Sequence, residues 1–502
     1  MKHRLSLRLV ALLLLFCIFV VPLTACGEPD ADETTLPPEI SSAVDSYFGN
    51  GPVTTPIVTV PTTTPVTTPV TTGVGAVVTT APAVTAPPTS GGEIVSRESF
   101  EAFLALVNYD KVAEVERYYE TYYIGEYRSM VSCVLEIFDY IIATYLFEEV
   151  GDTELATAVF VNSYVAVLGD RYAYYYDPSS YGDYTEDLSG EYTGIGVSVV
   201  LTQAGYADIL TVFPDSPAEE AGLLPGDLLV AVDGTDFAEI GYQEAINRIR
   251  GEVGTTVRLT VERDGVRTEY TVTRRKVTEV TVDYRMLDGK IGYIRITSFD
   301  DRTYEQFVAA HQALEAEGAT AYVFDMRNNP GGTLNSVVAI LEYILPDGDI
   351  VHLNYKQYGY SIDSIHDLSS AYMDGEHRFY YPGHVIDAPM VVLANENTAS
   401  AGELFTSSLM DYEVATMIGQ TTYGKGVGQS SLPVGKDGSA VTITVFSYDP
   451  PVSENYDGVG ILPDVSVALS EEASKKNIYK LTYDEDVQLQ AAVAALSSVN
   501  SQ

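Results

Sequence analysis

The spacing of apolar residues changes along the chain, and each spacing predicts a different kind of secondary structure. Between residues 93 and 189, apolar positions recur every three or four residues in the stretches Phe100 to Val115, Met130 to Phe147 and Leu155 to Leu168. This is the period of an amphipathic helix. Between residues 190 and 276, short runs such as ADILTVF and TVRLTVERDG alternate with turns, which is typical of strands. We therefore predict a helical N-terminal region followed by a β-rich domain.

From residue 277 to 502 the pattern changes again, because strands now alternate with helices. The apolar runs IGYIRIT, AYVFDMR and PMVVLANE are each followed by a stretch with helical spacing. This order predicts a βα-layered core with a mostly parallel central sheet, whose functional loops follow the strands. The expected fold is thus multidomain α/β, with a helical region, a β-rich domain and a βα-layered core.

The first residues have the pattern of an export signal. Basic residues precede an uncharged apolar run from Leu9 to Leu23, and the run ends in the sequence LTAC. We predict a signal peptide over residues 1–25. The ending resembles a bacterial lipobox, which implies cleavage before Cys26 and lipidation of its thiol. An uncleaved anchor and an ordinary signal peptidase site are the alternatives. The expected location is extracytoplasmic, with the lipid holding the protein on the cell membrane.

A linker is predicted between the signal and the folded part. Between Gly51 and Gly92 there is no charged residue, and Thr, Pro, Val, Ala and Gly dominate the composition. Such a composition does not support a packed core. We expect residues 26–92 to form a disordered, lipid-anchored linker.

The charge of the chain excludes one class of partner. Seventy acidic residues against 28 basic ones leave a formal net charge of −42. Such a surface repels a phosphate backbone, so nucleic acid is not an expected partner. The excess of acid is typical of a well-solvated surface, and selection for basic substrates is a second interpretation. The sequence contains no metal-ligand cluster and no nucleotide-binding loop, so we expect neither metal nor cofactor.

Ser400 is the candidate nucleophile. It follows the apolar run PMVVLAN, within the sequence NTASAGEL, at the expected start of a helix. Small neighbours leave its hydroxyl accessible, and the N–H groups of a helix N-terminus can stabilise an oxyanion. A serine that only caps the helix is the alternative.

Lys425 is a better candidate for the general base than any histidine. None of the six histidines lies in a motif that recommends it, and Thr398 replaces the first glycine of a Gly-x-Ser-x-Gly elbow. Lys425 lies in the glycine-rich sequence TYGKGVGQ, and no acidic residue occurs between Glu413 and Asp437. Burial without a carboxylate partner lowers the pKa of a lysine toward neutrality, as a Ser-Lys mechanism requires. An exposed lysine in a turn is the alternative.

Gln429 lies four residues after the candidate base and is a candidate for orienting it. An extended strand would separate the two residues by roughly 13 Å. The role therefore requires a bent backbone.

The β-rich domain resembles a PDZ domain. Gly194-Ile195-Gly196-Val197 matches the loop that binds a carboxylate, and SPAEEAGLLPGD at 216–227 matches the most recognisable run of that family. Backbone N–H groups of the loop can receive a terminal carboxylate while the next strand pairs with the peptide. A small barrel with ordinary glycine turns is the alternative.

The chain as a whole resembles the C-terminal processing, or tail-specific, serine peptidases. Besides the spacing of Ser400, Lys425 and Gln429, the resemblance depends on five shorter motifs. These are LGD at 168–170, DLSGE at 187–191, YIRITSF at 293–299, DMRNNPGG at 325–332 and GVGILPD at 458–464.

The resemblance implies a Ser-Lys dyad assisted by Gln429, with the oxyanion held by backbone N–H groups of Gly331, Gly332 and Ala401. It also implies that the PDZ domain engages the C-terminal tails of protein or peptide substrates. We expect a serine endopeptidase that acts through an acyl-enzyme, and a homodimer is possible for such a protein. The alternative is a catalytically silent surface scaffold that only binds peptides through its PDZ domain.

Overall fold

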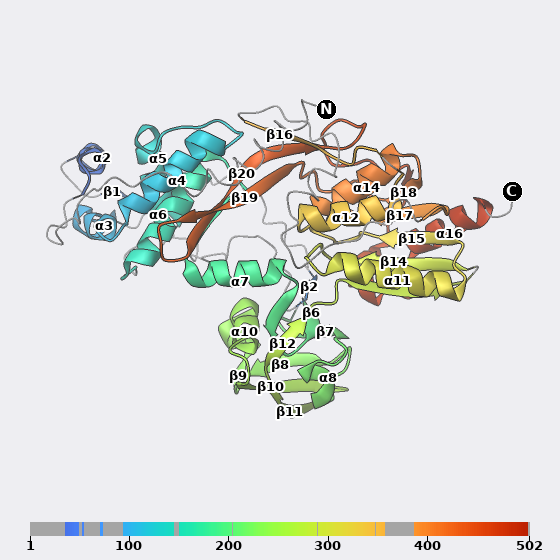
Figure 1. The fold of residues 1–502 in the computed structure, drawn as a ribbon. Helices are drawn as coiled ribbons and strands as arrows, with labels where there is room; N and C mark the ends of the chain where they lie inside the picture. Colours follow the sequence, from blue (N-terminus) through green and yellow to red (C-terminus); the bar gives the residue numbers. More distant parts are fainter. Residues whose placement is uncertain are drawn as a thin grey trace, which may run out of the picture.

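The structure is a computed structural model in which the elements form three groups: a helical region, a β-rich domain and a βα-layered core (Figure 1). It describes residues 36–49, 94–144, 150–202, 204–288, 290–346, 348–356 and 386–499, and the short strands β1 (Val53–Thr54) and β2 (Thr71–Gly73). The predicted signal peptide and Cys26 lie outside these residues. Within the described part of the chain, no helix combines the length and the apolar character needed to cross a membrane.

The N-terminal region is helical, as the three- and four-residue spacing predicts. Its elements are α3 (Arg97–Leu104), α4 (Tyr109–Tyr122), α5 (Met130–Thr144), α6 (Thr153–Leu168), β4 (Tyr174–Tyr176) and α7 (Pro178–Leu188). α6 begins at Asp152, whose side chain accepts from the Leu155 N–H, and it ends at Gly169 in the left-handed conformation.

The predicted linker is wrong at its beginning, because residues 38–48 form helix α2 (Pro38–Phe48). Ile40, Val44 and Phe48 are buried, and they recur every fourth residue on one face of the helix. The Phe48 ring packs on Phe100 of α3. The uncharged composition of residues 51–92 begins only after this helix. Residues 38–48 have a short amphipathic pattern instead, and this pattern explains why they form a helix.

The β-rich domain has its own hydrophobic core, separate from the rest of the chain. Its main sheet has the strand order β11-β10-β8-β7-β6, and all these pairs are antiparallel. The strands are β6 (Val197–Leu201), β7 (Ala207–Val212), β8 (Leu228–Val232), β10 (Thr256–Arg263) and β11 (Val266–Thr273). Short β9 (Thr235–Asp236) and helices α8 (Pro217–Ala221), α9 (Phe237–Ile240) and α10 (Tyr242–Ile249) complete the domain.

Two paired strands connect this domain to the remainder of the chain. β5 (Glu191–Gly194) enters the domain and β12 (Arg275–Thr278) leaves it, and the two are antiparallel partners. In addition, β2 pairs antiparallel with β6 and extends the main sheet of the domain by one strand.

The βα-layered core contains a six-stranded sheet with the order β13-β14-β15-β17-β18-β21. All neighbouring pairs are parallel except β13–β14, so the predicted mostly parallel sheet is confirmed. The strands are β13 (Val282–Leu287), β14 (Ile291–Ile296), β15 (Ala321–Asp325), β17 (Met390–Ala394), β18 (Ala415–Gly419) and β21 (Val465–Ser466).

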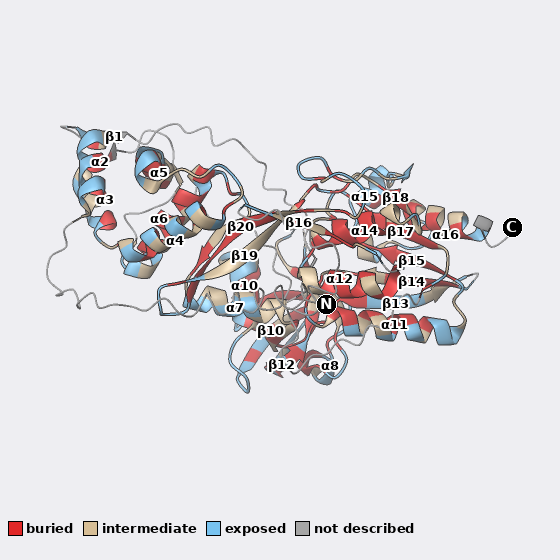
Figure 2. Ribbon diagram, turned by 45° about the horizontal axis from the view of Figure 1, so that its top comes forward, coloured by how far each residue is buried: buried red, intermediate tan, exposed pale blue. Residues whose placement is uncertain are grey.

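Helices cover both faces of this sheet, and the buried residues lie between the layers (Figure 2). α11 (Thr303–Glu317), α12 (Leu334–Ile344) and α14 (Ala401–Asp411) share one hydrophobic cluster with one face, and α16 (Val487–Val499) packs on the other. The short helices α15 (Glu471–Ser474) and η2 (Ile478–Lys480) precede α16.

A long hairpin joins the core to the helical region. β19 (Val427–Val434) and β20 (Ser439–Asp449) pair with each other, and β20 also pairs with β16 (His352–Tyr355) and with β4 of the helical region. At the hairpin, Lys111 of α4 binds Asp437 and Glu154 at 2.6 and 2.9 Å. One hydrophobic cluster continues from the helices into the core. The helical region therefore lies directly against the segment that carries Lys425.

Candidate active site

Ser400 lies where β17 turns into α14, in a backbone conformation that is unusual for any residue but glycine. Its φ is +55° and its ψ is −120°. Such a conformation costs on the order of 1–3 kcal/mol and persists only where the surroundings enforce it. The turn places the serine directly before the first residue of the helix, Ala401.

Glu403 is the residue that enforces this turn. Its buried carboxylate accepts from the backbone N–H of Ser400 at 2.9 Å, Gly424 at 2.7 Å and Lys425 at 2.8 Å, and from the Thr422 hydroxyl at 2.5 Å. Burial raises the pKa of Glu403, and these four hydrogen bonds oppose that rise. Sequence reasoning did not single out Glu403, although a glutamate three residues after a helix-capping serine is a recognisable signal.

Lys425 is desolvated at its ammonium end. Burial lowers its pKa to about 8, although the nearby Glu403 carboxylate acts in the opposite direction. The absence of acidic residues around Lys425 in the sequence is thus misleading, because the fold brings Glu403 close. None of the ion pairs within the described residues involves Lys425. The Tyr448 hydroxyl donates to the Lys425 carbonyl and also interacts with the Ser400 side chain.

Gln429 lies on β19, directly after an irregularity in the pairing with β20 at Gly428. Its Nε2 donates to the Thr444 hydroxyl at 3.1 Å, and that hydroxyl donates to Asp170 at 2.7 Å. The structure therefore ties Gln429 to the helical region, and its role toward Lys425 stays a prediction.

The loop after β15 brings Gly331 against Ser400, the candidate nucleophile. A Cβ at Gly331 would lie 2.7 Å from Ser400 Cβ and 3.0 Å from Ala401 N, so a larger residue does not fit. Gly332 approaches the Phe299 backbone as closely, since a Cβ there would lie 1.9 Å from its oxygen. The Gly331 N–H donates to Asn329 Oδ1 at 2.8 Å, so it is already engaged. Gly331 and Ala401 thus lie together as the resemblance implies, and their oxyanion role stays a prediction.

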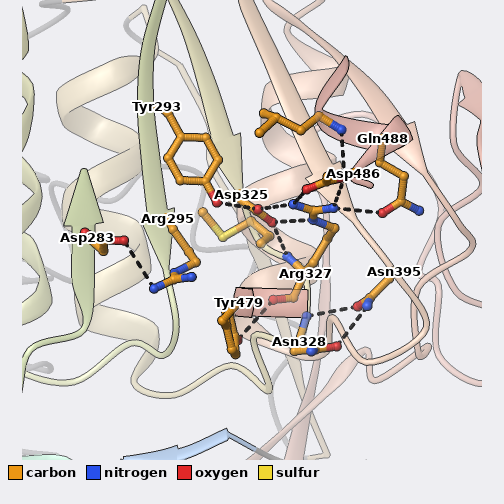
Figure 3. A network of polar contacts seen from close by, with 12 residues as sticks. Asp283, Tyr293, Arg295, Asp325, Arg327, Asn328, Asn395, Tyr479, Asp486 and Gln488 are labelled. Atoms are coloured by element: carbon orange, nitrogen blue, oxygen red, sulfur yellow. Dashed lines mark hydrogen bonds and ion pairs between the residues drawn. The ribbon is translucent and has the colours of Figure 1, made fainter. Parts of the chain in front are cut away.

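A buried cluster of charged residues lies at the start of the loop after β15 (Figure 3). Arg327 binds Asp325 at 2.5 Å and Asp486 at 2.8 Å, and it donates to Gln488 at 3.0 Å. Tyr293 donates to Asp325 at 2.7 Å. Burial acts to raise the pKa of Asp325, but Arg327 outweighs it and holds that pKa below its usual value. The cluster fastens the start of the loop to the segment that leads into α16.

The proposed carboxylate-binding loop of the β-rich domain is held by the second motif of that domain. The Ile195 carbonyl accepts from the Ala218 N–H at 2.8 Å, at the start of α8. Gly196 has a φ of +81°, and a Cβ there would lie 2.4 Å from Ser216 Cβ. Gly194 precedes these residues at the end of β5, and the buried Val197 begins β6. The two sequence motifs therefore meet in space, and β6 leads directly out of the loop.

The described residues contain no group of three or more His, Cys, Asp and Glu side chains placed to hold a metal ion. What the site does contain is a hydroxyl on a strained turn, a lysine of lowered pKa and a glycine-rich loop beside them. These are the parts of a nucleophilic site.

Comparisons with known proteins agree with the two halves of this description. Residues 290–467 match the model of peptidase family S41, and residues 209–263 match the model of the PDZ domain. A carboxyl-terminal-processing protease of Synechocystis sp. is 32% identical over 67% of this chain and 76% of its own length. The carboxy-terminal processing protease CtpA of Bacillus subtilis is 31% identical over 65% of this chain and 67% of its own length.

Among solved structures, a photosystem II D1 C-terminal processing protease is 26% identical, with a TM-score of 0.42 over 72% of this chain and 93% of its own. The two family-model matches define this molecule as a peptidase with a PDZ domain. The chain belongs to the family of carboxyl-terminal-processing proteases.

Proposed function

We propose that the protein is a serine endopeptidase in which Ser400 is the nucleophile and Lys425 the general base. The observation that carries this proposal is the shared Glu403 carboxylate, which holds the backbones of both residues at 2.9 and 2.8 Å. Holding two reacting groups in one geometry supplies a large part of an enzyme's rate enhancement. The lowered pKa of Lys425, caused by burial, supplies the neutral amine that a base needs.

The reaction follows from these roles. Neutral Lys425 takes the proton of Ser400 as the serine oxygen bonds to the substrate carbonyl carbon, and the carbonyl oxygen becomes an oxyanion. The C–N bond then breaks, and the leaving amine receives the proton from Lys425. Water, deprotonated by the same lysine, hydrolyses the acyl-enzyme and restores Ser400. Backbone N–H groups at Gly332 and Ala401 are the proposed oxyanion donors, and Gly331 joins them once its bond to Asn329 is released.

Substrate capture is assigned to the PDZ domain. A free C-terminal carboxylate would bind at the loop of Gly194, Ile195 and Gly196, and the tail would pair with β6 as an added strand. Support comes from the pairing of β2 with that edge, since β6 accepts an antiparallel strand there. The domain's natural ligands would be protein or peptide substrates that displace this segment.

The remaining parts of the proposal concern location. We infer export and lipidation at Cys26 from the sequence pattern. Replacing Cys26 by alanine would then release the protein from the membrane fraction into the soluble fraction. Retention in the membrane would contradict the lipid anchor.

One experiment tests the catalytic assignment. The parent protein and its Ser400→Ala and Lys425→Ala variants are incubated with an unfolded protein that ends in apolar residues, and products are followed by mass spectrometry. Lys436→Ala, at an exposed lysine in the tip of the β19–β20 hairpin, is the matched control. We expect cleavage by the parent and the control only, and slower cleavage when the substrate's C-terminus is amidated. A parent that binds the tail without cleaving it would instead support the scaffold function.

A further inference from the structure

Tyr172 lies over the candidate base although it belongs to a different part of the chain. It follows α6 in the helical region, and its ring centroid is 4.5 Å from Lys425 Nζ. Its neighbour Arg171 lies over the same ring, with its guanidinium carbon 4.7 Å from the centroid. One aromatic ring therefore contacts two cations, one exposed and one inside the site.

The contact between Lys425 and the ring has a definite energetic effect. An ammonium over the face of a tyrosine is attracted by about 0.5–1 kcal/mol at exposed sites and by about 2 kcal/mol when both are desolvated. The attraction fixes the position of Nζ at the end of a flexible four-carbon chain. The ring also covers the ammonium end of Lys425 from solvent.

Charged groups near the ring shift the pKa of Lys425 in both directions. Arg171 is 52% exposed and faces Asp457 at 3.9 Å. Its charge lowers the pKa of Lys425, after the larger effects of burial and Glu403. Asp170 and Asp457 are the remaining charged groups that act on Lys425, and both raise its pKa. Tyr172 thus contacts both a solvent-facing cation and the candidate base.

The Tyr172 hydroxyl is buried, and Tyr423 is the side chain that interacts with it. Burial raises the pKa of Tyr172, so the ring stays neutral in the range where the peptidase would act. Besides the interaction with Tyr423, the ring itself contacts Lys425 and Arg171.

We propose that Tyr172 is a positioning residue for Lys425, and that the helical region completes the active site through it. The proposal depends on the proposed function, because it concerns the base of that mechanism. The ring holds Nζ in place and excludes water from it, while the hydroxyl contributes little. The N-terminal helices are then more than a support, since the loop after α6 supplies one wall of the site.

Three substitutions separate these contributions. Tyr172→Phe keeps the ring and should leave kcat/KM within about 2-fold of the parent. Tyr172→Leu keeps an apolar cover without the aromatic face, and it should lower kcat/KM by about 10- to 30-fold, the fold-change that corresponds to the loss of one desolvated cation–π contact. Tyr172→Ala should lower it at least as much and should also admit water to the base.

The pH profile of kcat/KM is the readout that a purely structural role would not change. Because Tyr172→Ala hydrates Lys425, its acidic limb should move to higher pH, toward the usual value for lysine of about 10.4. Tyr172→Leu should move the limb the other way, because the ammonium loses its aromatic partner while it stays dry. Tyr122→Ala, at an exposed tyrosine of α4, is the control and should behave as the parent.

Several outcomes would overturn the proposal. The first is an acidic limb of the pH profile that does not move in Tyr172→Ala. The second is a loss of kcat/KM in Tyr172→Phe as large as in Tyr172→Ala. The third is a parent-like kcat/KM in all three variants. Thermal unfolding and labelling of Ser400 by a fluorophosphonate show whether each variant is folded. If Lys425→Ala also cleaves at the parent rate, the proposed function itself fails; if only the Tyr172 variants do, the dyad stands and the positioning role falls.

Discussion

Ser400 and Lys425 donate their backbone N–H groups to the same atom, Oε2 of Glu403, at 2.9 and 2.8 Å. One buried carboxylate oxygen therefore sets the distance between the turn that presents the candidate nucleophile and the loop that presents the candidate base. The other oxygen accepts from Gly424 and Thr422 in the same loop. The relative position of the two loops depends on this residue more than on any contact between the two reacting side chains.

Glu403→Gln should therefore impair catalysis without touching either reacting group. An amide presents one acceptor and one donor, so its nitrogen would face N–H groups that themselves donate. We expect kcat to fall on the order of 100-fold, the effect of displacing a reacting group by about 1 Å. Steady-state kinetics with a peptide substrate would measure this. Glu472→Gln, at an exposed glutamate of α15, should match the parent, and an equal loss there would remove the explanation.

The rate should rise with pH through the pKa of the base. Burial lowers the pKa of Lys425 to about 8, and only the neutral amine accepts a proton. The kcat/KM should thus increase about 10-fold per pH unit below pH 7 and level off above pH 8 to 9.

Lys425→Arg is a second test of the same role, because arginine stays protonated at every accessible pH and cannot act as a base. It should be inactive throughout. A profile in the parent that is flat between pH 6 and 9, or an active arginine variant, would show that Lys425 is not the base.

The Arg327 cluster should contribute strongly to stability. Arg327 and Asp325 are 2% and 3% exposed in their side chains, and removing one partner of a buried ion pair costs about 3–5 kcal/mol. Arg327→Met should lower the free energy of unfolding by about this amount in urea denaturation. The control is Arg267→Met in the PDZ domain, where the pair with Glu262 is exposed and worth about 0–1 kcal/mol. Similar losses in the two variants would contradict the special role of the cluster.

Three buried carboxylates lie where the PDZ domain joins the rest of the chain, and they should make the stability of the protein depend on pH. Burial raises the pKa of Glu279 to about 8, with Asp300 as the next cause, and it raises the pKa of Asp187 and of Asp300 to about 6. Arg250, 2.9 Å from Asp187, is the cation that faces them. Because the folded state binds these protons more tightly than the unfolded state, stability falls as pH rises from about 4 to about 8.

Glu279→Gln should remove the largest part of this dependence. The amide carries no charge at any pH, so the free energy of unfolding at pH 8 should increase by on the order of 1–2 kcal/mol, with little change at pH 5. Urea denaturation at both pH values would measure the difference. Glu269→Gln on β11, which is exposed, should change neither value. A stability that is independent of pH in the parent would contradict the raised pKa values.

The sequence by itself predicts most helices and strands and the candidate dyad of Ser400 and Lys425. The three- and four-residue spacing of apolar positions predicts the helices, and the alternation in the PDZ domain predicts its strands, because both patterns are local consequences of backbone geometry. Ser400 and Lys425 stand out for the same reason, since a serine after a buried strand and a lysine between glycines are visible in short windows. Two local patterns were not predicted: the apolar residues of α2 at 40, 44 and 48, and Glu403 three residues after Ser400.

The tertiary structure decides which distant side chains share a charge or a hydrogen bond. Glu403 reaches Lys425 across 22 positions, and Arg327 reaches Asp486 across 159. Neither pairing leaves a local pattern, because both depend on how the sheet orders its strands and where α16 returns. The contact between Tyr172 and Lys425 is of the same kind. Sequence patterns therefore identify the groups that can react, while the packing of distant segments decides their pKa values and positions.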